Sequence, residues 1–192
     1  LVATQVVSRL GAALDARVPV RELFEASTVD ALAARLESHA GTGGRTALTA
    51  QERAERIPLS LAQSRMWFLN RFDPESTAYN LPMAMRVSGD LDIEALRAAI
   101  GDVVARHETL RTVYPETVDG PVQVILPAAQ VIPEVDVVEV DPEGITDALG
   151  EFVGLPFDVT VQVPVRVRVF AVAPGEFVLA LVVHHISADG SS

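Results

Sequence analysis

The residues with the clearest chemical potential lie at the end of the sequence, where an apolar run meets two histidines. Leu179–Ser192 reads LALVVHHISADGSS, and the composition before His184 and His185 is typical of a buried strand. Because consecutive side chains of a strand point to opposite faces, the two imidazoles are expected to have different surroundings. One is predicted to face a cavity, and the other to pack or hydrogen-bond in the sheet. A histidine at a strand end suits general-base or hydrogen-bonding work near neutral pH.

Asp189 and Gly190 complete this pattern. The Asp189 carboxylate can accept a hydrogen bond from the backbone or from an arginine and so hold the loop. Gly190 is expected to use a backbone angle closed to other residues. Two other interpretations of the histidines are a metal site and a pair that only packs in the core. A third and a fourth ligand at a recognisable spacing are lacking, so no metal site is predicted.

The composition of the 192 residues excludes several classes of function. All 15 basic residues are Arg, and 26 acidic residues give a net charge of −11, so nucleic-acid binding is not expected. A chain without Lys has no Schiff-base lysine, and a chain without Cys has no thiolate nucleophile or disulfide. The lack of Cys fits a cytoplasmic protein. The sequence has no run of roughly 18 apolar residues, so no membrane span is predicted.

Helical patterns occupy the first forty residues. Residues 1–14 and 29–40 place apolar side chains at helical spacing, and a short helical turn follows Pro19. The first pattern begins at Leu1 without a capping residue before it, so its natural start is expected upstream. Residues 41–56 are rich in Gly, Thr and charge, which predicts a linker and a domain boundary.

From Ile57 the pattern changes to strands that alternate with helices, so the predicted fold class is α+β in two domains. Helices are predicted from about Ser60, over 92–110 with Asp90 or Asp92 as the cap, and over 145–157. Strands are predicted at 79–89, 111–115 and 121–127, and on both sides of a turn at Pro174–Gly175.

The two strands at that turn have different patterns. In the first, valines alternate with Arg166 and Arg168, which predicts that the arginine face meets solvent. The second is apolar throughout, which predicts burial on both faces.

The histidine pattern resembles the HHxxxDG motif of the condensation domains of nonribosomal peptide synthetases. Two further stretches resemble motifs of that family in the expected order: SLAQSRMWFL at Ser60–Leu69 is similar to the first core motif, and RHETLRTVY at Arg106–Tyr114 to the second. The sequence AQSRMWFLNRF, followed by YNLP, is more similar to the class of condensation domains that joins two L-configured units than to epimerisation domains. The sequence departs from the pattern at Ser191, where many members have Trp, and altered loop packing is expected there.

The resemblance implies roles for individual residues. His185 would be the central catalytic residue, which positions or deprotonates an attacking amine. His184, Asp189 and Gly190 would support it by setting the loop and the imidazole orientation. Either Arg106 or Arg111 would pair with Asp189, as an arginine of this motif does in the family, with a solvated arginine as the alternative for each. The side chains of the first motif are expected in the core, namely Met66, Trp67, Phe68 and Leu69.

Residues 1–40 resemble the latter half of a peptidyl carrier protein. In that family a serine carries 4′-phosphopantetheine, and here that serine is expected immediately before Leu1, so no cofactor-binding residue is expected in this chain. Residues 41–56 would be the linker. Residues 57–192 would be the N-terminal lobe of a condensation domain, a chloramphenicol-acetyltransferase-like α/β sandwich. The chain is accordingly expected to be a segment of a larger synthetase.

The implied reaction is amide bond formation. The amine of an acceptor aminoacyl thioester on a downstream carrier would attack the carbonyl of a donor acyl or peptidyl thioester on the upstream carrier. The implied partners are both carriers, their thioesters and a phosphopantetheinyl transferase, with no nucleic acid and no membrane. Three alternatives stay open: a non-catalytic docking module of the same fold, an epimerisation domain, and a CoA-dependent acyltransferase.

Overall fold

The computed structural model describes residues 2–26, 28–37, 41 and 52–190. The chain divides into two compact units, Leu1–Glu52 and Arg53–Ser192. Each unit has a hydrophobic core of its own.

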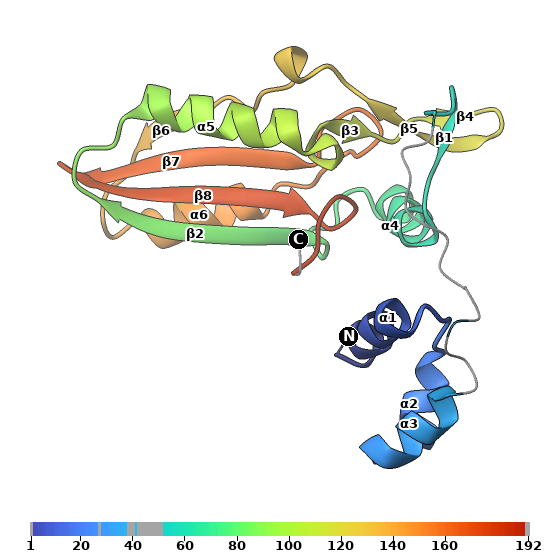
Figure 1. The fold of residues 1–192 in the computed structure, drawn as a ribbon. Coiled ribbons are helices and arrows are strands. Elements are labelled where there is room, and N and C mark those ends of the chain that lie inside the picture. Colours follow the sequence, from blue (N-terminus) through green and yellow to red (C-terminus); the bar gives the residue numbers. More distant parts are fainter. Residues whose placement is uncertain (1, 27, 38–40, 42–51, 191–192) are drawn as a thin grey trace. The chain divides into compact units, whose positions relative to one another are not determined.

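Helices form the described part of the first unit (Figure 1), and they are α1 (Val2–Leu14), α2 (Val20–Glu25) and α3 (Val29–Glu37). The apolar side chains of Val7, Val18 and Leu36 are buried together. Arg35 of α3 is tied to Glu22 of α2 by an ion pair of 2.6 Å. The predicted helices are confirmed wherever the structure describes them, and the end of the last predicted helix lies outside the described residues.

A mixed sheet with the strand order β2-β8-β7-β6 forms the centre of the second unit (Figure 1). Its strands are β2 (Asn80–Ser88), β8 (Glu176–His184), β7 (Val165–Ala173) and β6 (Asp136–Glu139). Neighbours are antiparallel except β6 and β7, which are parallel and therefore need a crossover connection; helix α6 (Ile145–Val153) lies in it. The predicted strands at the Pro174–Gly175 turn are confirmed. Strand β6 was not predicted, because it is only four residues long and exposed throughout.

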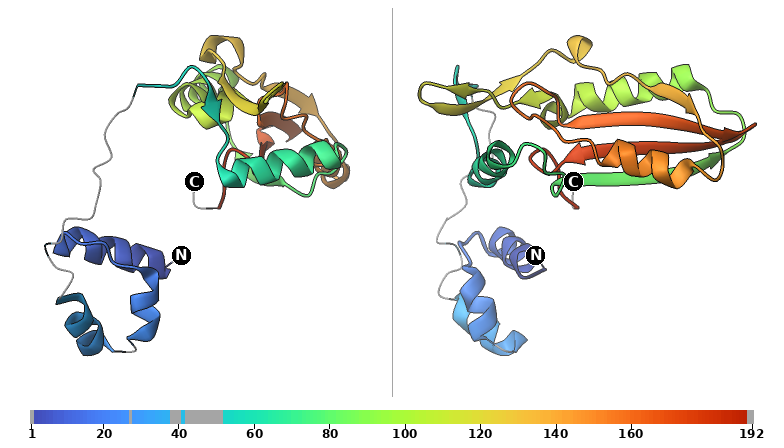
Figure 2. Two further views of the ribbon diagram at one scale, coloured as in Figure 1. Left: turned by 90° about the vertical axis from the view of Figure 1, so that its right-hand side faces the viewer. Right: turned by 180° about the vertical axis from the view of Figure 1, so that it is seen from behind.

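Helices cover both faces of this sheet, as the views in Figures 1 and 2 show. On one face, helix α5 (Ile93–Arg106) packs Leu96 and Ile100 against the buried valines of β7. On the other face, Phe152 of α6 packs edge to face against Phe170 of β7, with ring centroids 6.2 Å apart. Strand β8 is therefore covered on both sides, as its apolar sequence predicts.

The start of α5 is fixed by Asp92, whose side chain accepts a hydrogen bond from the Ala95 N–H at 2.9 Å. Asp92 is one of the two predicted caps. The helix is shorter than the predicted range 92–110, because it ends at Arg106 and a 3₁₀ turn follows at Glu108–Arg111. That turn brings the second motif of the sequence to the end of the sheet where β8 finishes.

A smaller sheet and helix α4 (Leu61–Phe72) lie at that end of the unit. The strands of the smaller sheet are β1 (Ile57–Pro58), β3 (Thr112–Val113), β4 (Glu116–Thr117) and β5 (Gly120–Ile125). Gly120 has a φ of 101°, a conformation that favours glycine, at the turn between β4 and β5. Arg53 pairs with Glu108 at 2.7 Å, so part of the predicted linker packs on this unit.

Two expectations about exposure are wrong. Arg166 and Arg168 were expected to face solvent, but both lie on the α6 side of the sheet, where their guanidinium carbons stand 3.8 and 4.8 Å from the ring centroids of Phe157 and Phe152. A guanidinium can stack on an aromatic face, so the alternation of valine and arginine does not mark a solvent face here. Phe68 was expected in the core, yet its side chain is 60% exposed.

Candidate active site

Helix α4 forms one wall of the candidate site, and its first turn is fixed by a capping box. The Ser60 hydroxyl accepts a hydrogen bond from the Gln63 N–H at 3.2 Å, and the Gln63 side-chain carbonyl accepts one from the Ser60 N–H at 2.9 Å. The Gln63 amide nitrogen also lies 3.4 Å from the hydroxyl of Tyr114. Tyr114 is fully buried, and its burial raises the pKa of the phenol to about 12, so the hydroxyl stays protonated. These contacts hold Gln63 in one place.

His184 is the last residue of β8 and is 2% exposed. Its ring packs edge to face against Phe157, with centroids 5.8 Å apart, and lies 6.4 Å from the ring of Tyr79. Its Nδ1 accepts a hydrogen bond from the Ile186 N–H at 3.2 Å, which places the imidazole proton on Nε2. Burial, followed by the nearby His185 and Arg166, lowers the pKa of His184 to about 4. His184 is therefore a neutral, packed histidine at physiological pH.

His185 points away from this core. Its backbone N–H donates to the carbonyl of Tyr79 at 2.9 Å, and its side chain is exposed. The ring Nδ1 lies 2.9 Å from the carbonyl oxygen of Ala188. A carbonyl oxygen only accepts hydrogen bonds, so Nδ1 carries a proton, and in the neutral form of the ring the lone pair is on Nε2. The predicted division of the two histidines, one in the core and one toward a cavity, is confirmed.

A cavity of about 360 Å³ adjoins His185. It is lined by segments that are far apart in the sequence, namely the cap residue Ser60 with Ala62, Gln63 and Met66 of α4, Thr109 of the 3₁₀ turn, and residues 185–189. Each of the three motifs that the sequence analysis singled out therefore contributes to one cavity. Gln63 and Thr109 were not predicted as individual site residues. The Ser-x-x-Gln spacing of a capping box was the signal that would have found Gln63.

The other predicted site residues have distinct places. Asp189 is exposed and lines the cavity. Gly190 does not have a positive φ, and a Cβ there would meet no atom within 4 Å, so the expectation of a conformation closed to other residues is wrong. Arg106 is exposed in the last turn of α5. Arg111 donates to the carbonyl of Leu126 at 2.6 Å and so joins the 3₁₀ turn to β5. The pairing of either arginine with Asp189 stays a prediction.

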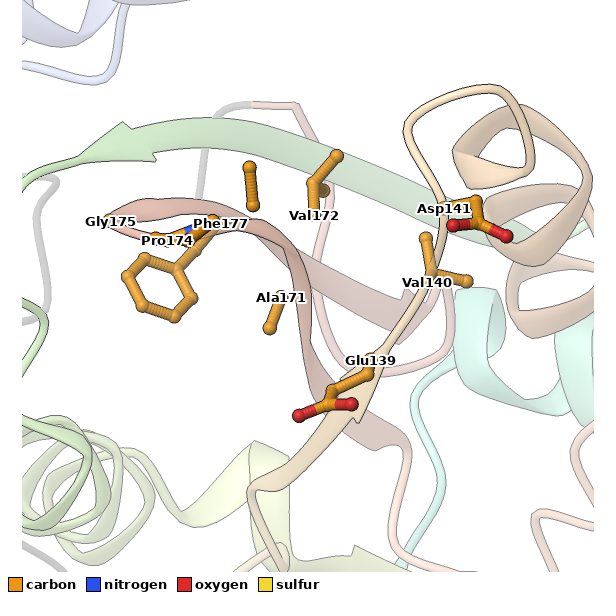
Figure 3. Close-up of a pocket in the computed structure, with 9 residues that line it drawn as sticks. Glu139, Val140, Asp141, Ala171, Val172, Pro174, Gly175 and Phe177 are labelled. Atoms are coloured by element: carbon orange, nitrogen blue, oxygen red, sulfur yellow. The ribbon is translucent and has the colours of Figure 1, made fainter.

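A larger cavity, of about 540 Å³, lies at the opposite end of the sheet (Figure 3). It is bordered by Glu139 and Asp141 and by the turn at Pro174–Gly175 between β7 and β8. The strand β8 separates this turn from the two histidines by its whole length. Size alone is a poor guide to function here, because the smaller cavity is the one that is lined by an imidazole.

Within the described ranges, no group of three or more His, Cys, Asp or Glu side chains is arranged to hold a metal ion. None of the helices described is long and apolar enough to cross a membrane.

Comparison with known sequences gives consistent results. A family model described as "Condensation domain" matches residues 53–192. The whole chain is 44% identical to a segment of CymA, a probable nonribosomal peptide synthetase of Salinispora arenicola, and 41% identical to a segment of a dimodular nonribosomal peptide synthase of Bacillus subtilis. The chain spans only 2% and 8% of the length of these two relatives.

A solved structure gives the same fold. The X-domain from teicoplanin biosynthesis, in its complex with OxyB, is 38% identical, with a TM-score of 0.69 over 78% of this chain and 32% of that one. The predicted α+β class is confirmed by this likeness. With the family match over residues 53–192, it shows that the chain belongs to the condensation-domain family of nonribosomal peptide synthetases.

Proposed function

We propose that the second unit contributes the histidine-bearing lobe of a condensation domain that forms amide bonds during nonribosomal peptide synthesis. The observation that carries the proposal is the cavity at His185, which all three sequence motifs line. In the reaction, the acceptor amine attacks the carbonyl of the donor thioester. The new C–N bond forms, the C–S bond breaks, and the proton lost by the amine protonates the leaving thiolate.

The Nε2 lone pair of His185 would accept the hydrogen bond, or the proton, of the attacking amine. Positioned general bases contribute roughly 10²- to 10⁴-fold in rate. A neutral amine is already a nucleophile, so orientation by His185 can supply much of this effect. The neutral His184 places no second positive charge beside the amine and would set the loop together with Asp189 and Gly190. Arg106 or Arg111 would support that loop by pairing with Asp189.

We further propose that residues 1–40 are the C-terminal part of a carrier domain, residues 41–56 the linker, and residues 57–192 the first lobe of the condensation domain. The identity to both relatives extends over all 192 residues and supports this order. The carrier's 4′-phosphopantetheine, attached to a serine expected just before Leu1 by a phosphopantetheinyl transferase, would supply the thiol that carries the acyl group. The cavity wall of Ser60, Gln63 and Met66 carries no charge and offers a hydroxyl and an amide beside an apolar side chain, which suits such an amide-containing arm. We propose a cytoplasmic location.

The test uses the complete synthetase polypeptide, with its upstream carrier loaded with an acyl donor and its downstream carrier with an aminoacyl acceptor. Mass spectrometry follows donor mass onto the acceptor. His185→Ala is expected to slow transfer by roughly 10²- to 10⁴-fold. His107→Ala is the control, because His107 is also an exposed histidine but does not line the cavity. Equal transfer by wild type and His185→Ala would refute the role of His185.

A second candidate function is a docking module of the same fold, and one observation favours it. The similar X-domain from teicoplanin biosynthesis was solved in complex with another protein, OxyB. A docking module would leave the donor mass on the upstream carrier even in wild type. Two enzymatic alternatives give other signatures: an epimerisation domain exchanges the α-proton of the carrier-bound residue, and a CoA-dependent acyltransferase uses free acyl-CoA as the donor.

A further inference from the structure

The segment Leu155–Phe157, which follows α6, is held by polar side chains from three other elements. The backbone carbonyl groups of this segment accept hydrogen bonds from these side chains. The Leu155 carbonyl accepts from Asn80 at 3.0 Å and from Arg166 at 2.6 Å. The Phe157 carbonyl accepts from Asn70 at 2.7 Å. The segment is therefore fixed from α4, β2 and β7 together.

This segment packs the ring of Phe157 against the buried His184. Phe157 is 1% exposed, and its ring contacts both the guanidinium of Arg166, whose central carbon is 3.8 Å from the ring centroid, and the imidazole of His184, whose centroid is 5.8 Å away. His184 in turn fixes the turn that projects His185, because its Nδ1 accepts the Ile186 N–H. A continuous series of contacts thus runs from Arg166 through Phe157 and His184 to the start of the loop.

Arg166 occupies an unusual environment for a charged residue. Among the described residues, no carboxylate lies within ion-pair distance of its guanidinium, and its Nε is buried without a hydrogen-bond partner. Burial and the neighbouring Arg168 lower the pKa of Arg166. Arg166 is half-buried, and a charge that is partly removed from water without an ion-pair partner lowers stability. The guanidinium of Arg166 contacts backbone carbonyls and an aromatic face, and both kinds of contact hold Leu155–Phe157.

We infer that Arg166 is a positioning residue for the reaction at His185: it clamps Leu155–Phe157 so that Phe157 holds His184, and His184 holds the turn that aims His185. The inference rests on the proposed condensation function for its effect on rate. Small misplacements of a reacting group cost on the order of 10²-fold in rate, so the expected effect of a lost clamp falls on kcat rather than on KM.

Arg168 provides a matched control. It lies two residues further along the same strand and on the same face, and it also stacks on a phenylalanine, Phe152. Its Nε, like that of Arg166, is buried without a partner. The difference is that Phe152 packs edge to face against Phe170, whereas Phe157 packs edge to face against His184. Arg166→Met and Arg168→Met therefore remove similar packing and charge, but only the first removes the contact with the ring that touches His184.

The first measurement is carrier-to-carrier transfer in the complete synthetase under single-turnover and saturating conditions. Arg166→Met is expected to lower kcat on the order of 10²-fold with little change in KM. Arg168→Met is expected to keep kcat close to wild type. Arg166→Lys, which can reach the carbonyls but lacks the planar fork that stacks on Phe157, is expected to restore part of the rate. Equal effects of the two methionine variants would overturn the inference.

The second measurement does not depend on activity. Diethyl pyrocarbonate modifies accessible neutral imidazoles, and peptide mass mapping of the complete protein counts the modified histidines. In wild type, the exposed His185 is expected to react and the buried His184 to be protected. Arg166→Met is expected to expose His184 to the reagent, and Arg168→Met to leave it protected. Protection of His184 in Arg166→Met would overturn the clamp even if wild type proved inactive in condensation, so the two proposals fail separately.

Discussion

The two faces of the central sheet are built from different chemistry. The face under α5 is mainly aliphatic: the buried valines of β7 pack with Leu179, Leu181 and neighbouring side chains. The face under α6 carries phenylalanines, two stacked arginines and the buried His184. The side chains of the first face contribute only to packing. Those of the second face also connect the sheet to residues 185–189, the segment that carries His185. The same strands therefore support stability on one side and the geometry of the candidate site on the other.

This comparison predicts that substitutions of equal size will have unequal consequences on the two faces. A substitution that removes side-chain volume on the α5 face should lower the free energy of unfolding and leave the chemistry of the folded protein intact. A loss on the α6 face near His184 should affect both.

The largest effect is expected at Phe157, which is 1% exposed on the α6 face. Phe157→Ala removes a core ring and should lower the unfolding free energy of the condensation unit by about 3–5 kcal/mol. Phe152→Ala, at the other end of the same face, should cost a similar amount. Urea unfolding followed by the fluorescence of Trp67, which is in this unit, measures both.

The variant Phe157→Leu separates stability from geometry. It keeps most of the volume, so the loss of stability should stay below about 1.5 kcal/mol. Without the ring beside His184, kcat should still fall, while Phe152→Leu should keep the wild-type value. A normal kcat for Phe157→Leu would show that the aromatic contact with His184 has no part in the reaction.

The next largest effect concerns pH, because a titratable group is buried only on the α6 face of the sheet among the residues described. The pKa of His184 is lowered from 6.5 to about 4, so between these values the unfolded chain binds a proton that the folded chain does not. Stability from the neutral imidazole is complete above pH 6.5 and is lost as the pH falls toward 4. The loss should approach on the order of 3 kcal/mol.

His184→Asn tests this pH dependence, because its side-chain oxygen can still accept the Ile186 N–H but does not titrate in this range. Unfolding free energies of wild type and His184→Asn should converge as the pH falls from 7 to 4, since only wild type loses the imidazole contribution. Identical slopes in the two proteins would mean that His184 is not held neutral by the fold.

A smaller effect is expected on the aliphatic face. Val169 is fully buried there, and Val169→Ala should cost about 2 kcal/mol of unfolding free energy from lost burial and the cavity left behind. Its kcat at a temperature where the protein is folded should match wild type. A large fall in kcat with little loss of stability would remove the distinction between the faces.

The sequence predicted most of the fold because periodicity is a local property. The alternation of β7, the apolar run of β8 and the cap at Asp92 each reflect an arrangement that neighbouring residues dictate. The division of labour between His184 and His185 followed from the same alternation. Strand β6 escaped detection because its pairing with β7 depends on residues about thirty positions away, as the register of Asp136 with Arg168 shows.

The side-chain contacts that complete the site could not be predicted from local sequence patterns. Arg166 was assigned to solvent because alternation identifies two faces but does not say what covers each of them. The stacking of Arg166 on Phe157 depends on where α6 ends, and the contact between Gln63 and Tyr114 on how α4 meets the smaller sheet. These are tertiary contacts, and each joins side chains whose sequence spacing has no local signature.

The smallest predicted effect compares two helix caps. Ser60 caps α4 and lines the His185 cavity, whereas Asp92 caps α5 and does not. Ser60→Ala and Asp92→Ala each remove one cap hydrogen bond and should each lower the unfolding free energy by about 1 kcal/mol. Only Ser60→Ala also removes a hydroxyl that lines the cavity, so it alone should raise KM for the loaded carriers. Since glycine at a cap costs only a few tenths of a kcal/mol, Ser60→Gly should regain stability without regaining KM. A normal KM in both Ser60 variants would show that the capping box holds α4 but does not shape the cavity.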